Sequence, residues 1–213
     1  MNISSKNNRR QFLKSTMALS SALVLTPSLM AFPETDYADS EKYMLGPQKG
    51  FSPQVGQLLS TMTMMREWVM DTVKDLSVDE LDFQIDDQSN SIGAMLLHLA
   101  ATERYYQLNT FDNVEWGSWD QSIKDEWDLG MNLGEKGREE IKGHKVSYYL
   151  KKLKTVRAHT IEEFAKRDDK WIQESEPFFE NKPTNNYCKW FHVCEHESNH
   201  RGQMKFVIKR LPK

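Results

Sequence analysis

Two histidines stand four residues apart near the C-terminal end, His196 and His200. On a helix of about 100° per residue they fall on an apolar stripe, where leucine is usual. The stripe comprises Val193, His196, His200, Met204, Val207 and Leu211. A buried imidazole without partners loses roughly 1–3 kcal/mol. Two imidazoles one turn apart can direct nitrogens at a single point, and a metal ion there would satisfy both. The alternative is a pair of core histidines bonded to other side chains or to water.

A third metal ligand would have to come from another part of the chain. Apart from the pair, His98 alone among the histidines is expected in mid-helix and in apolar company. It lies in a helix that should begin at Ser89, Asn90 or Ser91, all good N-caps, and end near residue 108. We therefore take His98 as the third candidate ligand. Its alternative role is that of a satisfied core or boundary residue.

Four amphipathic segments should position these histidines. They cover about residues 52–76, 89–108, 145–166 and 187–211, and each repeats its apolar residues with the helical period. Four such helices predict an all-α four-helix bundle, and we see no strand pattern. Residues 77–90 read as a connection with one short helical turn at most, and residues 168–186 read as a loop.

The link of residues 111–144 is long for a compact domain. A link of this kind is usually a crossover, a lid or a short extra helix. A crossover would let the second and third long helices run parallel to each other. Trp116 and Trp119 in this link could roof a pocket or pack on the flank of the bundle, and the sequence leaves both open.

The first 31 residues resemble an export signal. Arg9 and Arg10 precede an apolar run from Met17 to Ala31, as in signals of the twin-arginine type, which export folded proteins to the periplasm. An ordinary secretory signal is the alternative. The run is too short and interrupted for a stable membrane span. Residues 32–50 are polar and read as a linker, which leaves residues 51–213 as the bundle.

Composition bounds the classes of function. The chain has 213 residues, of which 38% are hydrophobic and 28% charged, as expected for one domain with a core. Loss of the signal would shift the formal charge from −3 to about −7, which argues against nucleic-acid binding. Cys188 and Cys194 on one helix would be about 9 Å apart in rise, too far for a disulfide.

Two stretches resemble the DinB-like superfamily of metal-binding four-helix bundles. They run from Ser91 to Glu103 and from His192 to Gln203, and the HxxxHRGQ ending is the most specific part. Residues 78–83 are similar to the linker after the first helix of that family. The resemblance covers about residues 51–211. It implies a metal site made of one histidine of the second helix and two of the fourth, matched here by His98, His196 and His200.

Other residues of the resembling stretches have less defined roles. His192 could be a substrate-binding or supporting group, or a boundary residue. Arg201 is expected to pair with an acid such as Glu103 or Glu197, and Gly202 would let a neighbouring helix approach closely. No general base stands out, since Glu195 points away from the histidine stripe.

Three neutral histidines leave a coordination position open, which is the pattern of catalytic rather than structural zinc sites. Zinc is the first choice, with nickel or another divalent ion as the alternative. Some members of the resembled family are transferases or isomerases acting on small thiols, but export from the cytoplasm argues against such a role here.

The sequence predicts a metal-dependent hydrolase or transferase of a small-molecule substrate. The alternatives are a non-catalytic metal-binding or ligand-binding bundle and a bundle with a structural metal. A homodimer is the default for such bundles.

Overall fold

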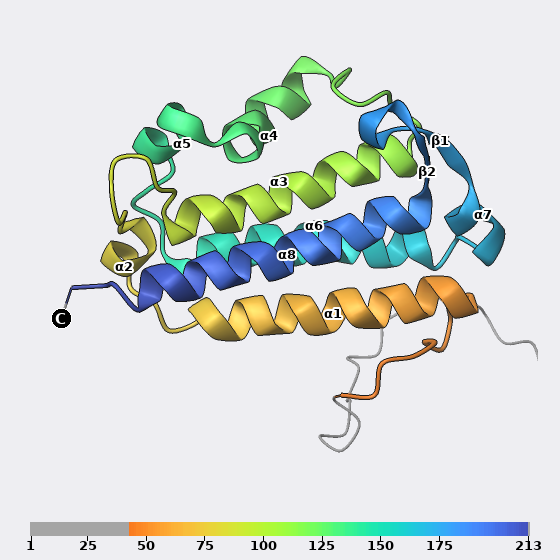
Figure 1. Cartoon of the computed structure of the whole chain (residues 1–213), viewed down its shortest axis with the longest axis horizontal. Helices are drawn as coiled ribbons and strands as arrows, with labels where there is room; N and C mark the ends of the chain where they lie inside the picture. Colours follow the sequence, from red (N-terminus) through yellow and green to blue (C-terminus); the bar gives the residue numbers. More distant parts are fainter. Residues whose placement is uncertain (1–42, 213) are drawn as a thin grey trace, which may run out of the picture. The chain divides into compact units, whose positions relative to one another are not determined.

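Four long helices form the body of the fold in the computed structural model, which describes residues 43–212. They are α1 (Pro53–Val73), α3 (Ile92–Thr110), α6 (Val146–Phe164) and α8 (Asn186–Ile208). Helix α1 packs against α8 and α6, and α3 packs against α6 and α8. Figure 1 shows α1 and α8 running in one direction and α3 and α6 in the other. The predicted all-α bundle is therefore confirmed.

Shorter elements connect the long helices. They are α2 (Val78–Asp82), α4 (Gln121–Asn132), α5 (Gly134–Glu140), α7 (Asp169–Gln173), the 3-10 turn η1 (Phe179–Asn181), and the strands β1 (Ser175–Pro177) and β2 (Pro183–Asn185). The two strands pair antiparallel, with Glu176 opposite Thr184. The prediction of a plain loop over residues 168–186 was wrong, because this segment holds α7 and the hairpin. Strands of three residues are too short to show an alternating pattern.

The long link after α3 is a crossover that contains two helices. Helix α4 packs on α3, and α4 and α5 lead back along it, so that α6 starts at the same end of the bundle as α3 (Figure 1). Trp119 and Trp127 are buried in the core, whereas Trp116 stays 38% exposed. The crossover thus explains why α3 and α6 are parallel, as predicted.

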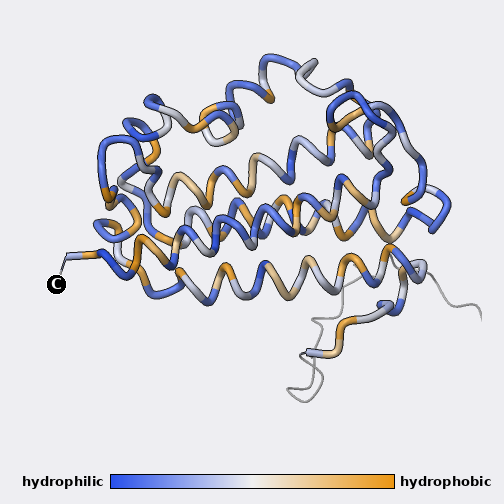
Figure 2. Tube along the Cα trace, viewed as in Figure 1, coloured by the Kyte–Doolittle hydropathy of each residue, from blue (hydrophilic) through white to orange (hydrophobic). Residues whose placement is uncertain are grey.

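Side-chain acceptors satisfy backbone N–H groups at the starts of two long helices. The Ser91 hydroxyl accepts a hydrogen bond from the Ala94 N–H, which caps α3. At the start of α1, Asp169 of α7 accepts a hydrogen bond of 2.9 Å from the Gln54 N–H. Figure 2 shows apolar and polar residues alternating along each long helix, and the apolar faces meet in two core clusters.

The predicted export signal and most of the predicted linker lie outside the described residues. At the end of that linker, the Gly46 N–H donates a hydrogen bond of 3.2 Å to the Ser60 hydroxyl of α1. Cys188 and Cys194 both lie on α8 as free thiols, the first exposed and the second buried. Within residues 43–212, no helix combines the length and apolar character that crossing a membrane requires.

Candidate metal centre

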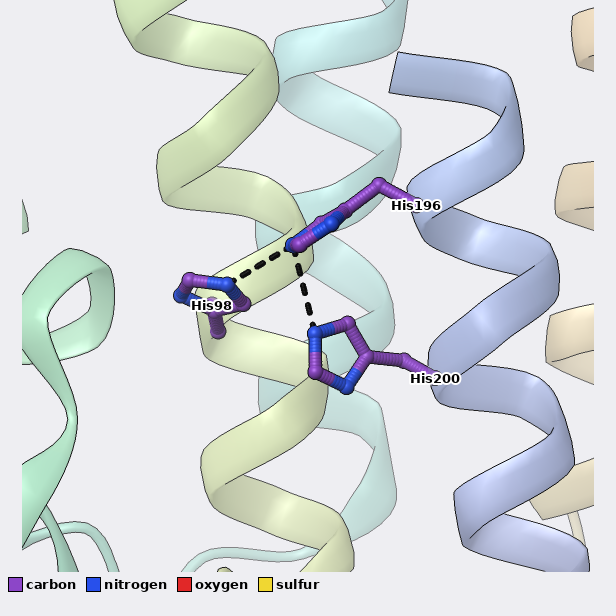
Figure 3. A group of neighbouring side chains, drawn as sticks. All are labelled: His98, His196 and His200. Atoms are coloured by element: carbon purple, nitrogen blue, oxygen red, sulfur yellow. Dashed lines mark hydrogen bonds between the residues drawn. The ribbon is translucent and has the colours of Figure 1, made fainter. Parts of the chain in front are cut away.

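Three imidazoles meet between α3 and α8. His98 comes from α3, and His196 and His200 come from successive turns of α8 (Figure 3). The Nε2 atom of His196 lies 2.8 Å from Nε2 of His98 and 3.2 Å from Nε2 of His200. One ligand atom from each ring lies within 4.8 Å of the others. The predicted convergence of these three side chains is confirmed.

The outer nitrogens of two rings are held by hydrogen bonds. His98 Nδ1 lies 3.0 Å from the carbonyl oxygen of Gly130, and His200 Nδ1 lies 3.2 Å from Oε1 of Gln203. A carbonyl oxygen, whether of the backbone or of an amide side chain, only accepts hydrogen bonds. The Nδ1 atom of each of these two rings therefore carries the proton and donates it. The Nε2 atoms of His98 and His200 are then left unprotonated and face the centre. Such outer partners orient the ligands of metal sites.

The environment keeps the rings neutral at neutral pH. Burial lowers the pKa of His196 to about 3, with further lowering by His200 and His98, and burial and then His98 lower the pKa of His200 to about 4. Burial also lowers the pKa of His98. Neutral imidazole is the form that binds metal ions.

The geometry of the three rings fits a cation. Two inward nitrogens are unprotonated, and the Nε2 atom of His196 has at most one proton to donate to them. One lone pair would therefore face the centre without a donor, whereas a cation would satisfy all three nitrogens. In the described part of the chain, the group consists of these three side chains.

Gly130 brings the crossover close enough to orient His98. A Cβ atom at this position would lie 2.8 Å from Cγ of Leu97 and 3.2 Å from its carbonyl oxygen. The absence of a side chain therefore lets α4 sit directly on α3, with the Gly130 carbonyl at His98 Nδ1. Sequence reasoning missed this residue, because glycine in the middle of a helix marks a close approach without naming the partner.

A group of four buried charges lies in the bundle core, with one residue from each long helix. We call Arg66, Glu103, Arg157 and Glu197 the charge quartet. Nη2 of Arg66 lies 2.7 Å from Oε2 of Glu103 and 2.5 Å from Oε1 of Glu197. Nε of Arg157 lies 2.7 Å from Oε1 of Glu103, and Nη2 of Arg157 lies 2.9 Å from Oε1 of Glu197. Two positive and two negative charges thus compensate one another.

The quartet stabilises the ionised form of its carboxylates. Glu103 is fully buried and also accepts a hydrogen bond of 2.6 Å from the Thr160 hydroxyl. Burial would raise the pKa of Glu103, but Arg157 and Arg66 lower it more, to about 2. Glu197, which follows His196 directly, ties α8 to the arginines of α1 and α6. The quartet therefore fixes which face of α8 is turned inward.

Two predictions for the signature stretch were wrong. Arg201 does not pair with Glu103 or Glu197, because those carboxylates bind Arg66 and Arg157. Its guanidinium lies 4.9 Å from the ring centre of Trp68 instead. Gly202 is exposed, and a Cβ there would meet nothing within 4 Å, so that no helix of residues 43–212 packs on it. Glu195 is exposed, as its place off the stripe predicted.

His192 extends the row of histidines by one turn. Its ring centre lies 5.3 Å from that of His196, and its Nδ1 lies 2.9 Å from the hydroxyl of Tyr106 on α3. This hydrogen bond holds the ring in place beside the three converging imidazoles.

The fold and the three imidazoles define a crossover helical bundle with a candidate histidine metal site. The sequence model of the DinB family matches residues 47–211, and the chain belongs to this family. No curated protein matches the chain.

Proposed function

We propose that this protein binds one divalent metal ion through His98, His196 and His200 and uses it to transform a small-molecule substrate. The observation that supports the proposal is the meeting of three Nε2 atoms, two of them oriented by outer hydrogen bonds. Zinc is the proposed ion, with nickel as the alternative, because imidazole suits both. His98, His196 and His200 would hold the ion, which would supply Lewis acidity to a bound substrate.

The residues around the site have defined tasks in this proposal. The Gly130 carbonyl and Gln203 hold the outer nitrogens of two ligands, and the charge quartet holds the face of α8 that carries the other histidines. The reaction is a hydrolysis or a group transfer. Membership of the DinB family and the donor set support metal binding, and the choice between the two reactions depends on the substrate.

A second candidate function is a metal that only ties α3 to α8. It is favoured by the fact that the ligands come from two helices that are far apart in the sequence. Chelation separates the two functions. If the metal is structural, chelation should lower the melting temperature of the protein strongly, and the protein should turn over no substrate class. If the metal is catalytic, the protein should turn over a substrate, and chelation should abolish that turnover.

The proposal includes export and self-association. Arg9, Arg10 and the apolar run that follows support export to the periplasm by the twin-arginine route. Folding before export would allow the metal to be bound in the cytoplasm. We further propose a homodimer that forms through a helix face, as is common in bundles of this type.

Elemental analysis of untagged protein tests the metal site. We expect one equivalent of a divalent ion in the native protein and none in the His200→Ala variant, because two imidazoles of a tripod bind too weakly to survive purification. His144→Ala is the matched control, since His144 is exposed, stacks on Tyr148 and does not belong to the three converging histidines. Metal retained in full by His200→Ala would overturn the ligand set.

A further inference from the structure

A cavity of about 640 Å³ opens beside His192, between the C-terminal end of α3, the start of the crossover and the β1–β2 hairpin. Its volume lies within the usual range of small-molecule sites. One wall consists of Tyr106, Trp116, Phe178 and Phe179. None of the three candidate metal ligands lines it. The cavity is therefore a separate compartment next to the candidate metal centre.

The aromatic wall offers a flat surface to a ligand. The ring of Trp116 lies 5.0 Å from that of Tyr106 and 5.2 Å from that of Phe178, measured between centres. Packed on these neighbours, the indole is held in place while 38% of the residue stays exposed. A rigid and partly uncovered indole at the edge of a cavity is suited to stacking against a flat apolar group.

The charges of the cavity favour a cation over an anion. Among the described residues that line it are Glu115, Glu176 and Glu180, and none of these lining residues is a lysine or an arginine. Lys189 pairs with Glu176 and Lys182 pairs with Glu180 from outside the lining. Glu115 forms no ion pair with any residue of the described chain, so its charge stays uncompensated. A carboxylate beside an aromatic wall is a suitable environment for an ammonium group.

His192 places this cavity next to the three imidazoles. The ring of His192 forms part of the cavity wall, and its centre lies 5.3 Å from that of His196. The hydrogen bond between the Tyr106 hydroxyl and Nδ1 of His192 fixes the ring between the two compartments. A ligand that stacks on Trp116 and touches His192 would therefore have one end a single ring away from the candidate metal centre.

We propose that this cavity binds the substrate, and that the substrate is an aromatic amine or an amine-bearing derivative with no net negative charge. The catalytic consequence rests on the proposed metal function, whereas the binding itself does not. An anionic ligand would meet the unpaired charge of Glu115 and, among the described lining residues, no basic side chain. The walls thus select by shape and by charge.

Two probes of matched shape and opposite charge test this inference. We would titrate the protein with 2-phenylethylamine and with phenylacetate and follow binding by NMR. The measurement uses both the native protein and His200→Ala, in which direct contact of the probe with a metal is removed. We expect the amine to bind at least about tenfold more tightly than the carboxylate in both proteins, because only the amine is attracted by Glu115.

Variants of the wall locate the binding. Trp116→Ala should weaken amine binding about tenfold, since it removes the stacking surface. Glu115→Gln should reduce the preference for the amine by a factor of about 3 to 10. Glu139→Gln and Phe206→Ala are the matched controls, because both residues are exposed and lie outside this cavity. Circular dichroism confirms that each variant is folded.

The results separate the two proposals. Equal affinity for the two probes, or an unchanged affinity in folded Trp116→Ala, would overturn the assignment of the cavity. Amine binding in a protein that takes up no metal would support the cavity and refute the proposed metal function. Metal uptake by a protein that does not prefer the amine would support the proposed metal site and refute the assignment of the cavity.

Discussion

Removing one charge of the quartet should destabilise the bundle strongly. Glu103→Gln keeps the size and shape of the side chain but deletes a negative charge with no exposed surface. Arg66 and Arg157 would then share Glu197 alone, which leaves one uncompensated positive charge in the core. Breaking a buried ion pair by removing one partner typically costs about 3–5 kcal/mol of unfolding free energy.

The lowered pKa of Glu103 makes this stabilisation depend on pH. The two arginines outweigh the effect of burial and hold this pKa at about 2, against 4.5 for an ordinary glutamate. A pKa that folding lowers means that the ionised carboxylate stabilises the folded state. Because the folded-state pKa is lowered, this stabilisation is present above pH 4.5 and is lost as the pH falls from about 4.5 to about 2.

Urea unfolding followed by circular dichroism, at pH 7 and at pH 3, tests this reasoning. We expect Glu103→Gln to lose about 3–5 kcal/mol at pH 7 and to show less dependence on pH than the native protein between these values. Asp71→Asn is the control, because Asp71 pairs with Lys74 on the surface and both side chains are more than half exposed. Its loss should stay below about 1 kcal/mol.

A double variant tests whether the cost arises from the unpaired charge. Glu103→Met combined with Arg157→Met removes one charge of each sign and leaves Arg66 paired with Glu197. It should recover part of the stability lost in Glu103→Gln, because apolar side chains can replace a complete buried pair with little loss. A loss in Glu103→Gln of less than about 1 kcal/mol at pH 7 would refute the description of the quartet as a mutually compensated group.

Two further predictions concern the metal centre and the address of the protein. Gly130→Ala should weaken metal affinity about 10–100-fold in equilibrium dialysis, because the new Cβ would lie 2.8 Å from Leu97 and displace the carbonyl that orients His98. Gly137→Ala is the control and should leave the metal affinity unchanged, since its Cβ would have no neighbour closer than 3.6 Å. Equal metal affinities of the two variants would contradict the orienting role of Gly130. Replacing Arg9 and Arg10 by lysine should retain the protein in the cytoplasmic fraction, whereas unchanged export would indicate an ordinary secretory signal.

Sequence reasoning found the three converging histidines because their positions carried a local signal. His196 and His200 interrupt an apolar stripe one turn apart, and His98 lies in mid-helix among apolar residues. The same signal was present at the quartet and was not used. Arg66 and Glu197 also interrupt apolar stripes with the helical period, which indicates burial of a charge.

The error at Arg201 has a different origin. Spacing along α8 shows that Arg201 and Glu197 lie on neighbouring turns, but it does not show which helix either residue faces. In the fold, Glu197 faces the arginines of α1 and α6, while Arg201 covers Trp68 on the outside of α1. The identity of a buried charge's partner depends on a contact between helices that are distant in the sequence.

The amino-acid sequence alone was enough to predict the four long helices, their apolar faces, the long crossover and the histidines that point inward. This is so because a helix is built from hydrogen bonds between residues four apart, and its periodicity is therefore written in neighbouring residues. Packing between helices settled the remaining features, namely the carbonyl of Gly130 at His98, the four charges in one group and the cavity beside His192. Each of these joins residues from different elements of the fold, and their separation in space is set by the shape and volume of the whole core.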